Sequence, residues 1–328
     1  MLNVAAKLVA EPFSDKVTKA PTRDGFGKGV VEAGKANKNV VVLCADLKES
    51  TRAEWFEKEF PERFIEVGVA EQAMATIASG MALAGKIPFI ASYACFSPGR
   101  NYEQIRTTIA LNKVSVKVCG MHAGVSVGAD GATHQMLEDI GMMRMLPGMT
   151  VINPCDALEA RKATVAAAKV PGPMYLRFGR AGVPIFTTPD TPFSIGKALI
   201  LWQGENPKVA LLATGSLSYN ALAAARALDA DGIASLVLHV PTIKPLDEAA
   251  IIEAAKRTRR IVTIEEHQVA GGFGSAVAEL LSEKYPAKIK RLGIEDEFGQ
   301  SGDPDELIEH YGLGASSIRH AAETFIKE

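Results

Sequence analysis

Short apolar runs rich in β-branched residues alternate with helix-like segments along the first half of the chain. The strand-like runs cover residues 39–46, 88–94, 114–121, 149–155 and 174–178. The helix-like segments between them cover residues 24–37, 71–85, 100–112, 134–146 and 156–169. Strands that are apolar on both faces are typical of parallel sheets covered by helices on both sides. The alternation therefore predicts a parallel α/β sheet.

A segment rich in Pro, Gly and Thr, residues 179–196, interrupts this alternation and has the composition of a linker. The alternation then resumes, with strand-like runs at 208–215, 233–240, 260–267 and 289–296. A chain of 328 residues is long enough for two domains. We therefore predict two consecutive parallel-sheet α/β domains, residues 1–185 and 197–328, joined by a linker at 186–196.

Composition excludes several classes of protein. The formal net charge is −2, without the basic excess of a nucleic-acid binder. No apolar run approaches the roughly 20 residues that span a membrane, and Lys7 breaks the short apolar run at the N-terminus, so we expect a cytoplasmic protein. The cysteines have no CxxC spacing and are interpreted as reduced core thiols, with no metal site among them: Cys44, Cys95, Cys119 and Cys155.

The segment "MHAGVSVGADGATHQMLED", residues 121–139, is the richest in functional groups. It follows a predicted strand, and ligands of open α/β sheets bind beyond the carboxyl ends of the strands. Its glycines permit an irregular loop that can hold His122, Asp130 and His134 together. These groups suit binding of, and proton exchange with, a polyhydroxylated substrate. An Asp–Gly turn with incidental histidines remains an alternative, whereas a zinc site would need a further close ligand.

Glu71 stands between an apolar strand-like run, Phe64–Val69, and a run of small residues that is typical of a buried helix. One interpretation is an exposed residue at a helix start, where a carboxylate favours the helix dipole. The other is a buried carboxylate with a function, because Glu is rarely buried without a partner. The local residues leave both interpretations open.

Arginines and aromatic residues lie at other predicted strand ends. Arginine suits bidentate recognition of phosphate, and a set of arginines in one cleft would indicate a phosphorylated substrate: Arg52, Arg100, Arg177 and Arg180. Tyr93 and Phe96 are either core residues or a platform for a flat heterocycle. The chain has no GxGxxG motif, no Walker loop, and no Gly-Asp-Gly followed some thirty residues later by Asn, the pattern that holds a metal-bound diphosphate.

Taken in order, the motifs of this chain resemble those of the transketolase family of thiamine-diphosphate enzymes, over nearly its whole length. The similar segments are "EVGVAEQAM", "PFIASYACFSPGRNYEQIR", "HAGVSVGADGATHQMLED", "MTVINPCDALEARKA", "PMYLRFGR", "TIEEHQVAGGFGSAVAELL" and "FGQSGDPDELIEHYGL". Full-length members have a diphosphate-binding, a pyrimidine-binding and a C-terminal domain. The chain looks like the second and third only, which agrees with the missing Gly-Asp-Gly pattern. The resemblance thus implies the C-terminal subunit of a split transketolase.

The resemblance also implies a cofactor and the residues that contact it. Glu71 matches the carboxylate that contacts N1′ of the aminopyrimidine and helps to activate thiamine diphosphate. Tyr93 and Phe96 match the aromatic bed of the pyrimidine. Gly99 replaces a third aromatic residue of the family, and Tyr102 is a candidate to compensate. The metal site, for Mg²⁺ or Ca²⁺, would belong mainly to a separate diphosphate-binding subunit, and we expect two copies of each subunit in the assembly.

The resemblance also implies which residues bind the sugar. His122, Asp130 and His134 match residues that contact sugar hydroxyls, with both histidines as catalytic candidates and His134 near the donor carbonyl. Arg177 matches a phosphate-binding arginine, and Arg52 matches a second one less closely. The implied reaction transfers a two-carbon ketol unit from a ketose phosphate to an aldose phosphate.

Three alternatives to this reaction remain. A deoxyxylulose-phosphate synthase should have an arginine-bearing loop in place of His122. The β subunit of a 2-oxo acid dehydrogenase should lack the His122–Asp130–His134 set. A non-catalytic interaction subunit could keep the fold, although every polar position named above retains a functional residue type.

Overall fold

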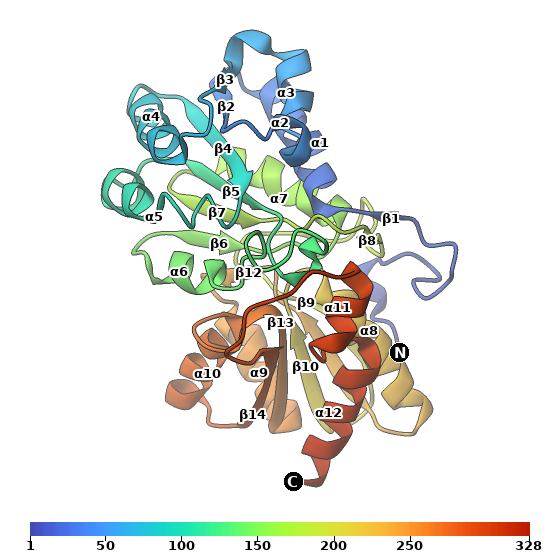
Figure 1. Ribbon diagram of the computed structural model, residues 1–328. Coiled ribbons are helices and arrows are strands. Elements are labelled where there is room, and N and C mark those ends of the chain that lie inside the picture. The colour runs from blue at the N-terminus through green and yellow to red at the C-terminus, as the bar shows by residue number, and fades with distance from the viewer.

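The computed structural model describes residues 1–328 as two α/β units, the first above the second in Figure 1. The first unit is built on a seven-stranded sheet of order β12-β6-β7-β5-β4-β2-β3, which is parallel except for β12. Its strands are β2 (Val40–Cys44), β3 (Phe64–Glu66), β4 (Ile87–Tyr93), β5 (Lys117–Met121), β6 (Thr150–Ile152), β7 (Met174–Arg177) and β12 (Thr242–Lys244). The predicted parallel sheet is confirmed.

Helices cover both faces of this sheet. They are α1 (Thr22–Ala36), α2 (Lys48–Thr51), α3 (Glu54–Glu59), α4 (Glu71–Leu83), α5 (Tyr102–Gln104), the π-helix η3 (Ile105–Ala110), α6 (Asp139–Met145) and α7 (Ala157–Lys169). Alternate residues of β2 enter different cores: Val41 packs with α4, η3 and α6, whereas Val42 packs with α1, α3 and α7. This two-sided burial explains why the strands are apolar at nearly every position.

The second unit has a five-stranded sheet of order β14-β13-β10-β11-β9, in which only β9 is antiparallel. Its strands are β9 (Leu199–Gln203), β10 (Val209–Ala213), β11 (Ser235–His239), β13 (Arg260–Gln268) and β14 (Lys288–Ile294). Its helices are α8 (Leu217–Ala230), α9 (Glu248–Thr258), α10 (Phe273–Lys284), α11 (Pro304–His310) and α12 (Ala315–Lys327). None of the helices is long and apolar enough to cross a membrane.

The two units exchange segments. Strand β12 follows β11 in the chain but pairs with β6 at the edge of the first sheet. In the opposite direction, the N-terminal segment reaches the second unit, where Asn3 donates its backbone N–H to the Leu201 carbonyl at 2.9 Å. A buried contact of 2.7 Å between Glu159 and His239 also crosses the boundary. The units are therefore joined along a broad, partly polar interface.

One predicted helix is shorter in the structure. The sequence predicts a helix over the whole of 134–146, but α6 begins only at Asp139. The preceding residues form a loop in which Gly124, Gly128 and Gly131 have φ of +89°, +83° and +70°. Glycine adopts these angles without steric cost. The loop thus extends from the end of β5 to α6 and carries both histidines of interest.

Candidate active site

The aromatic residues after β4 and the histidines of the β5–α6 loop form one cluster. Strands β4 and β5 are neighbours, and Tyr93 pairs with Met121 at their carboxyl ends. The rings of Tyr93 and Phe96 are nearly parallel with centroids 5.9 Å apart, and His122 stacks on Tyr93 at 3.8 Å. His134 contacts both aromatic rings edge-on, at 6.1 and 5.7 Å. Residues that are distant in sequence thus meet at one edge of the sheet.

The β5–α6 loop is held by the second unit. Glu266, at the end of β13, accepts the Ser126 N–H at 2.7 Å. A Cβ atom on Gly124 would lie 2.2 Å from the Glu266 carboxylate, so only glycine fits there. Gln135 donates to the carbonyl of Gln300 at 2.9 Å. The C-terminal unit therefore supports the loop that carries His122 and His134.

His134 and Asp130 occupy the accessible part of this loop. His134 is half-buried, and its Nδ1 lies 2.9 Å from the Thr133 hydroxyl. Asp130 is exposed and its side chain makes no hydrogen bond within the chain. Both residues can therefore reach a ligand on the open side of the cluster.

Glu71 is the first residue of α4, as a helix-start residue would be, but it is only 2% exposed. Its Oε2 accepts a hydrogen bond from Arg100 Nη1 at 2.8 Å. Its backbone carbonyl accepts one from the Asn101 side chain at 3.0 Å. The interpretation of Glu71 as a solvated carboxylate is therefore wrong, because the group is buried and paired.

Three arginines affect the charge state of His122. Arg23 Nη1 lies 3.1 Å from His122 Nε2. Because a guanidinium can only donate, Nε2 accepts, and the proton of the neutral ring lies on Nδ1. That Nδ1 is buried and has no hydrogen-bond partner in the chain. Burial, together with the charges of Arg23, Arg180 and Arg52, lowers the pKa of His122 to about 3. The ring is therefore neutral at neutral pH and keeps a buried, unpaired N–H donor at Nδ1.

Arg23 was missed in the sequence. It lies in the first turn of α1, where no motif marks it, and it reaches the site because its backbone N–H bonds to the Gly179 carbonyl. Arg52, by contrast, was predicted and lies in this group, with its Nε 2.7 Å from Asp24 Oδ1. Arg180 donates to the Val127 carbonyl of the β5–α6 loop at 2.7 Å.

Arg177 does not lie at the open site. Its side chain is 5% exposed, and its Nε donates to Asp139 Oδ2 at 2.7 Å. Its Nη2 donates to the Glu266 carbonyl at 2.8 Å. The sequence assigned Arg177 to substrate phosphate, but the guanidinium is already neutralised inside the interface between the two units. The nearby Arg180 is half-buried and is better placed for a ligand.

The low pKa of His122 predicts a pH-dependent contribution to stability. Below about pH 6.5 the unfolded chain binds a proton that the folded chain excludes down to about pH 3. Because the unfolded state then binds more protons, the free energy of unfolding falls as pH decreases through this window. The free energy of unfolding is measured by urea denaturation between pH 4 and pH 7. We expect His122→Gln to make its decrease toward low pH less steep. An unchanged pH slope would contradict the neutral, buried ring.

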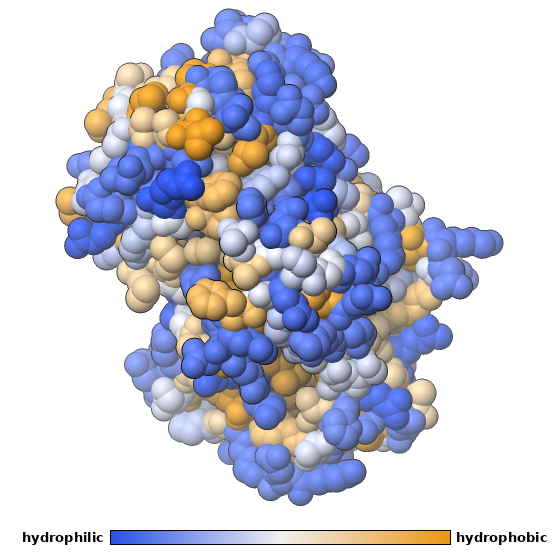
Figure 2. All heavy atoms as spheres, viewed as in Figure 1, coloured by the Kyte–Doolittle hydropathy of each residue, from blue (hydrophilic) through white to orange (hydrophobic).

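Apolar surface adjoins Glu71. Figure 2 shows orange surface over α4 and the segment that precedes it. Val69, Ile77 and Leu83 are 70%, 42% and 71% exposed. Val69 precedes α4, and Ile77 and Leu83 follow Glu71 along that helix, so the exposed apolar side chains extend along α4 and could serve as a protein interface. The carboxylate thus lies at the margin of a surface suited to a partner.

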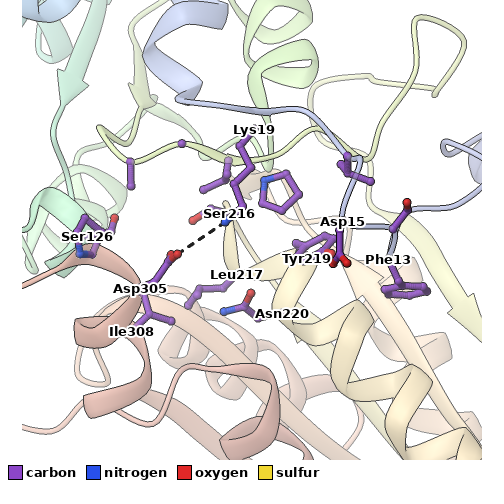
Figure 3. Close-up of a pocket in the computed structure, with 17 residues that line it drawn as sticks. Phe13, Asp15, Lys19, Ser126, Ser216, Leu217, Tyr219, Asn220, Asp305 and Ile308 are labelled. Atoms are coloured by element: carbon purple, nitrogen blue, oxygen red, sulfur yellow. Dashed lines mark ion pairs between the residues drawn. The ribbon is translucent and has the colours of Figure 1, made fainter.

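A separate cavity borders the β5–α6 loop at Ser126. Figure 3 shows it between the N-terminal segment, α8 and α11, with Lys19 and Asp305 paired at 3.7 Å. Its volume is about 340 Å³. Of the loop residues it includes only Ser126, and it contains none of the aromatic or histidine residues of the cluster. The candidate site is therefore the open edge of the first sheet.

Comparison with known proteins gives the family. The domain families "Transketolase, pyrimidine binding domain" and "Transketolase, C-terminal domain" match residues 18–184 and 196–318. A transketolase C-terminal section of Methanocaldococcus jannaschii is 44% identical over 90% of this chain and 93% of its own length. One of the subunits of the apulose-4-phosphate transketolase of Phocaeicola vulgatus is 38% identical over 93% of this chain and 97% of its own length.

A solved structure agrees with these matches. It is described as an inactive β4 tetramer of a split-gene transketolase, and it superposes with a TM-score of 0.87 at 43% identity. The superposition covers 94% of this chain and 98% of that one. The chain therefore belongs to the transketolase family and corresponds along its length to the C-terminal subunits of split transketolases.

Proposed function

We propose that this chain, together with a separate diphosphate-binding subunit, transfers a two-carbon ketol unit from a ketose phosphate to an aldose phosphate with thiamine diphosphate. The observation that carries the proposal is the grouping of a buried carboxylate, an aromatic platform and two histidines at one open edge. Glu71 lies beside Arg100 and Phe96, and Phe96 contacts His134. This combination suits a flat basic heterocycle next to a hydroxylated substrate.

The residues present fit the aminopyrimidine half of the cofactor. The Glu71 carboxylate already binds a planar nitrogen cation, the Arg100 guanidinium, against the Phe96 ring. When bound, thiamine diphosphate supplies the nucleophilic carbon that cleaves and re-forms the carbon–carbon bond. Glu71 would hold a proton at N1′, while Tyr93 and Phe96 would orient the ring. The diphosphate and its Mg²⁺ or Ca²⁺ would be bound mainly by the partner.

The histidine loop would bind the sugar. Because Thr133 contacts Nδ1 of His134, the Nε2 atom is left to exchange a proton with a hydroxyl or carbonyl oxygen of the donor sugar. Asp130 would accept a hydrogen bond from a sugar hydroxyl. His122 would donate from its unpartnered Nδ1. These are the roles that the sequence suggested for the three residues.

The arginines around His122 would bind the phosphate group of the sugar. Arg23, Arg52 and Arg180 contribute positive charge near the histidine, and the Nε of Arg23 is buried without a partner. Arginine offers paired N–H donors that match phosphate oxygens. Arg52 therefore keeps its proposed role, and we transfer the role first given to Arg177 to Arg180 and Arg23.

The apolar surface beside Glu71 would bind the partner subunit. Binding of the partner subunit to this surface would bury Val69, Ile77 and Leu83 and would bring the cofactor held by that subunit to the Glu71 carboxylate. The relative described as a β4 tetramer is also described as inactive, which suits a site that one chain cannot complete. We expect two copies of each subunit in the active assembly.

A reconstitution assay tests this function. Xylulose 5-phosphate and ribose 5-phosphate would be supplied with thiamine diphosphate and Mg²⁺ to the chain alone, and to its complex with the co-expressed diphosphate-binding subunit. We expect ketol transfer only in the complex. Transfer by the chain alone would contradict the shared site. A confirmed, cofactor-loaded complex that acts on neither these sugars nor apulose 4-phosphate would point to a different sugar or to a sister reaction.

A further inference from the structure

Arg100 makes two contacts that define the neighbourhood of Glu71. Its Nη1 lies 2.8 Å from Glu71 Oε2. Its guanidinium carbon lies 4.7 Å from the centroid of the Phe96 ring. The side chain makes no other hydrogen bond and is 47% exposed. Arg100 is thus held in place by these two neighbours alone.

We infer that Arg100 occupies the pyrimidine subsite of the separate chain and must leave it before the cofactor binds. This inference rests on the proposed function. A guanidinium is a planar cation that donates N–H groups in its plane and stacks on aromatic faces. An aminopyrimidine that carries a proton at N1′ has the same features. Both would donate to the Glu71 carboxylate and lie on Phe96, and one carboxylate oxygen cannot serve both in the same place.

The backbone around Arg100 is fixed, so the exchange would involve the side chain. The N–H of Arg100 bonds to the Phe96 carbonyl at 2.9 Å, and that of Gly99 bonds to the Ala94 carbonyl at 3.0 Å. A Cβ atom on Gly99 would lie only 2.1 Å from the Cys95 carbonyl oxygen, which shows how tight the turn is. The long, half-exposed side chain can instead rotate into solvent. Gly99, which replaces the family's third aromatic residue, thus directly precedes Arg100, whose guanidinium covers the Phe96 ring.

The pair with Arg100 accounts for the state of Glu71 in the absence of the partner subunit. A buried carboxylate without a positively charged neighbour is strongly destabilising, whereas an ion pair with an exposed arginine is weak and easily exchanged. Arg100 therefore keeps the carboxylate satisfied in the separate chain and competes with the pyrimidine for it. Cofactor binding by the separate chain would be weakened, and arrival of the partner would shift the competition toward the cofactor.

Binding of thiamine, which carries the aminopyrimidine without the diphosphate, tests the inference without an activity assay. Thiamine would be titrated into the full-length chain by calorimetry, and thiamine diphosphate into the assembled complex by tryptophan fluorescence. The variants are Arg100→Ala, Glu71→Gln, Glu71→Gln in the Arg100→Ala background, and the control Arg106→Ala, which alters an exposed arginine of η3 that has no hydrogen bond to the site. We expect Arg100→Ala to tighten binding about threefold to tenfold and Arg106→Ala to leave it unchanged.

The outcomes separate this inference from the proposed function. If Arg100→Ala binds as wild type or more weakly while Glu71→Gln loses binding, Arg100 is not a competitor, and the cofactor site stands. If Glu71→Gln in the Arg100→Ala background binds as tightly as Arg100→Ala alone, the carboxylate does not contact the pyrimidine, and the proposed function fails with the inference. If the separate chain binds thiamine too weakly to measure in every variant, the complex decides: a dissociation constant unchanged by Arg100→Ala overturns the inference.

Discussion

Glu71→Ala is expected to lower kcat of the assembled complex by about 10²–10⁴-fold, the usual effect of removing a general acid–base group. The carboxylate is 2% exposed at the start of α4, next to the aromatic platform. In the proposed site it would hold the proton at N1′ on which activation of the cofactor depends. The measurement is ketol transfer at saturating sugar and cofactor. Transfer within a factor of two of wild type would exclude the role.

Two controls separate a catalytic effect from loss of the complex. Gel filtration of Glu71→Ala with the partner subunit should show the same assembly as wild type, because the substitution removes a side chain whose only bonded partner is Arg100. Glu103→Ala removes an exposed carboxylate of α5 that bonds only to its neighbour Gln104. That variant should keep full activity. A similar loss in both variants would indicate a disturbed interface and not lost chemistry.

The order of strands and helices could be predicted because burial on both faces leaves a strong local pattern. Val40 to Cys44 are all buried, and the sequence shows five apolar residues there. The crossing of β12 could not be predicted. Its pairing with β6 joins residues about ninety positions apart, and the strand covers only Thr242–Lys244. A run this short carries no period, and only the packed structure selects its partner.

In the candidate site, too, local sequence patterns predicted some residues, whereas tertiary packing alone placed others. Glu71, Tyr93, Phe96 and His134 were proposed from motif and strand ends, and the structure brings them together. Arg23 was missed because tertiary contacts alone carry it there. For Arg177 a local signal was present and was not used. In β7, Arg177 shares a face with Tyr175, whose buried hydroxyl also donates to Asp139. Because every residue of β7 is buried, an arginine within it is expected to have a buried charge partner.

Arg177→Met is expected to destabilise the chain by about 3–5 kcal/mol, the usual result of removing one partner of a buried ion pair. Asp139 is fully buried and would lose its charge partner, although the Tyr175 hydroxyl remains 2.6 Å away. The bond from Arg177 to the Glu266 carbonyl, which links the two units, would be lost as well. The free energy of unfolding from urea denaturation is the measurement.

Two further variants locate the cause. Arg177→Met with Asp139→Leu removes both charges, so part of the lost stability should return, because the double change no longer leaves a charge unpaired. Arg180→Met changes a half-buried arginine that bonds only to the Val127 carbonyl. It should raise the KM for sugar phosphates about tenfold or more while changing stability little. If Arg177→Met instead raised KM and left stability within about 1 kcal/mol, Arg177 would be a phosphate ligand, and the buried pair would not be its main role.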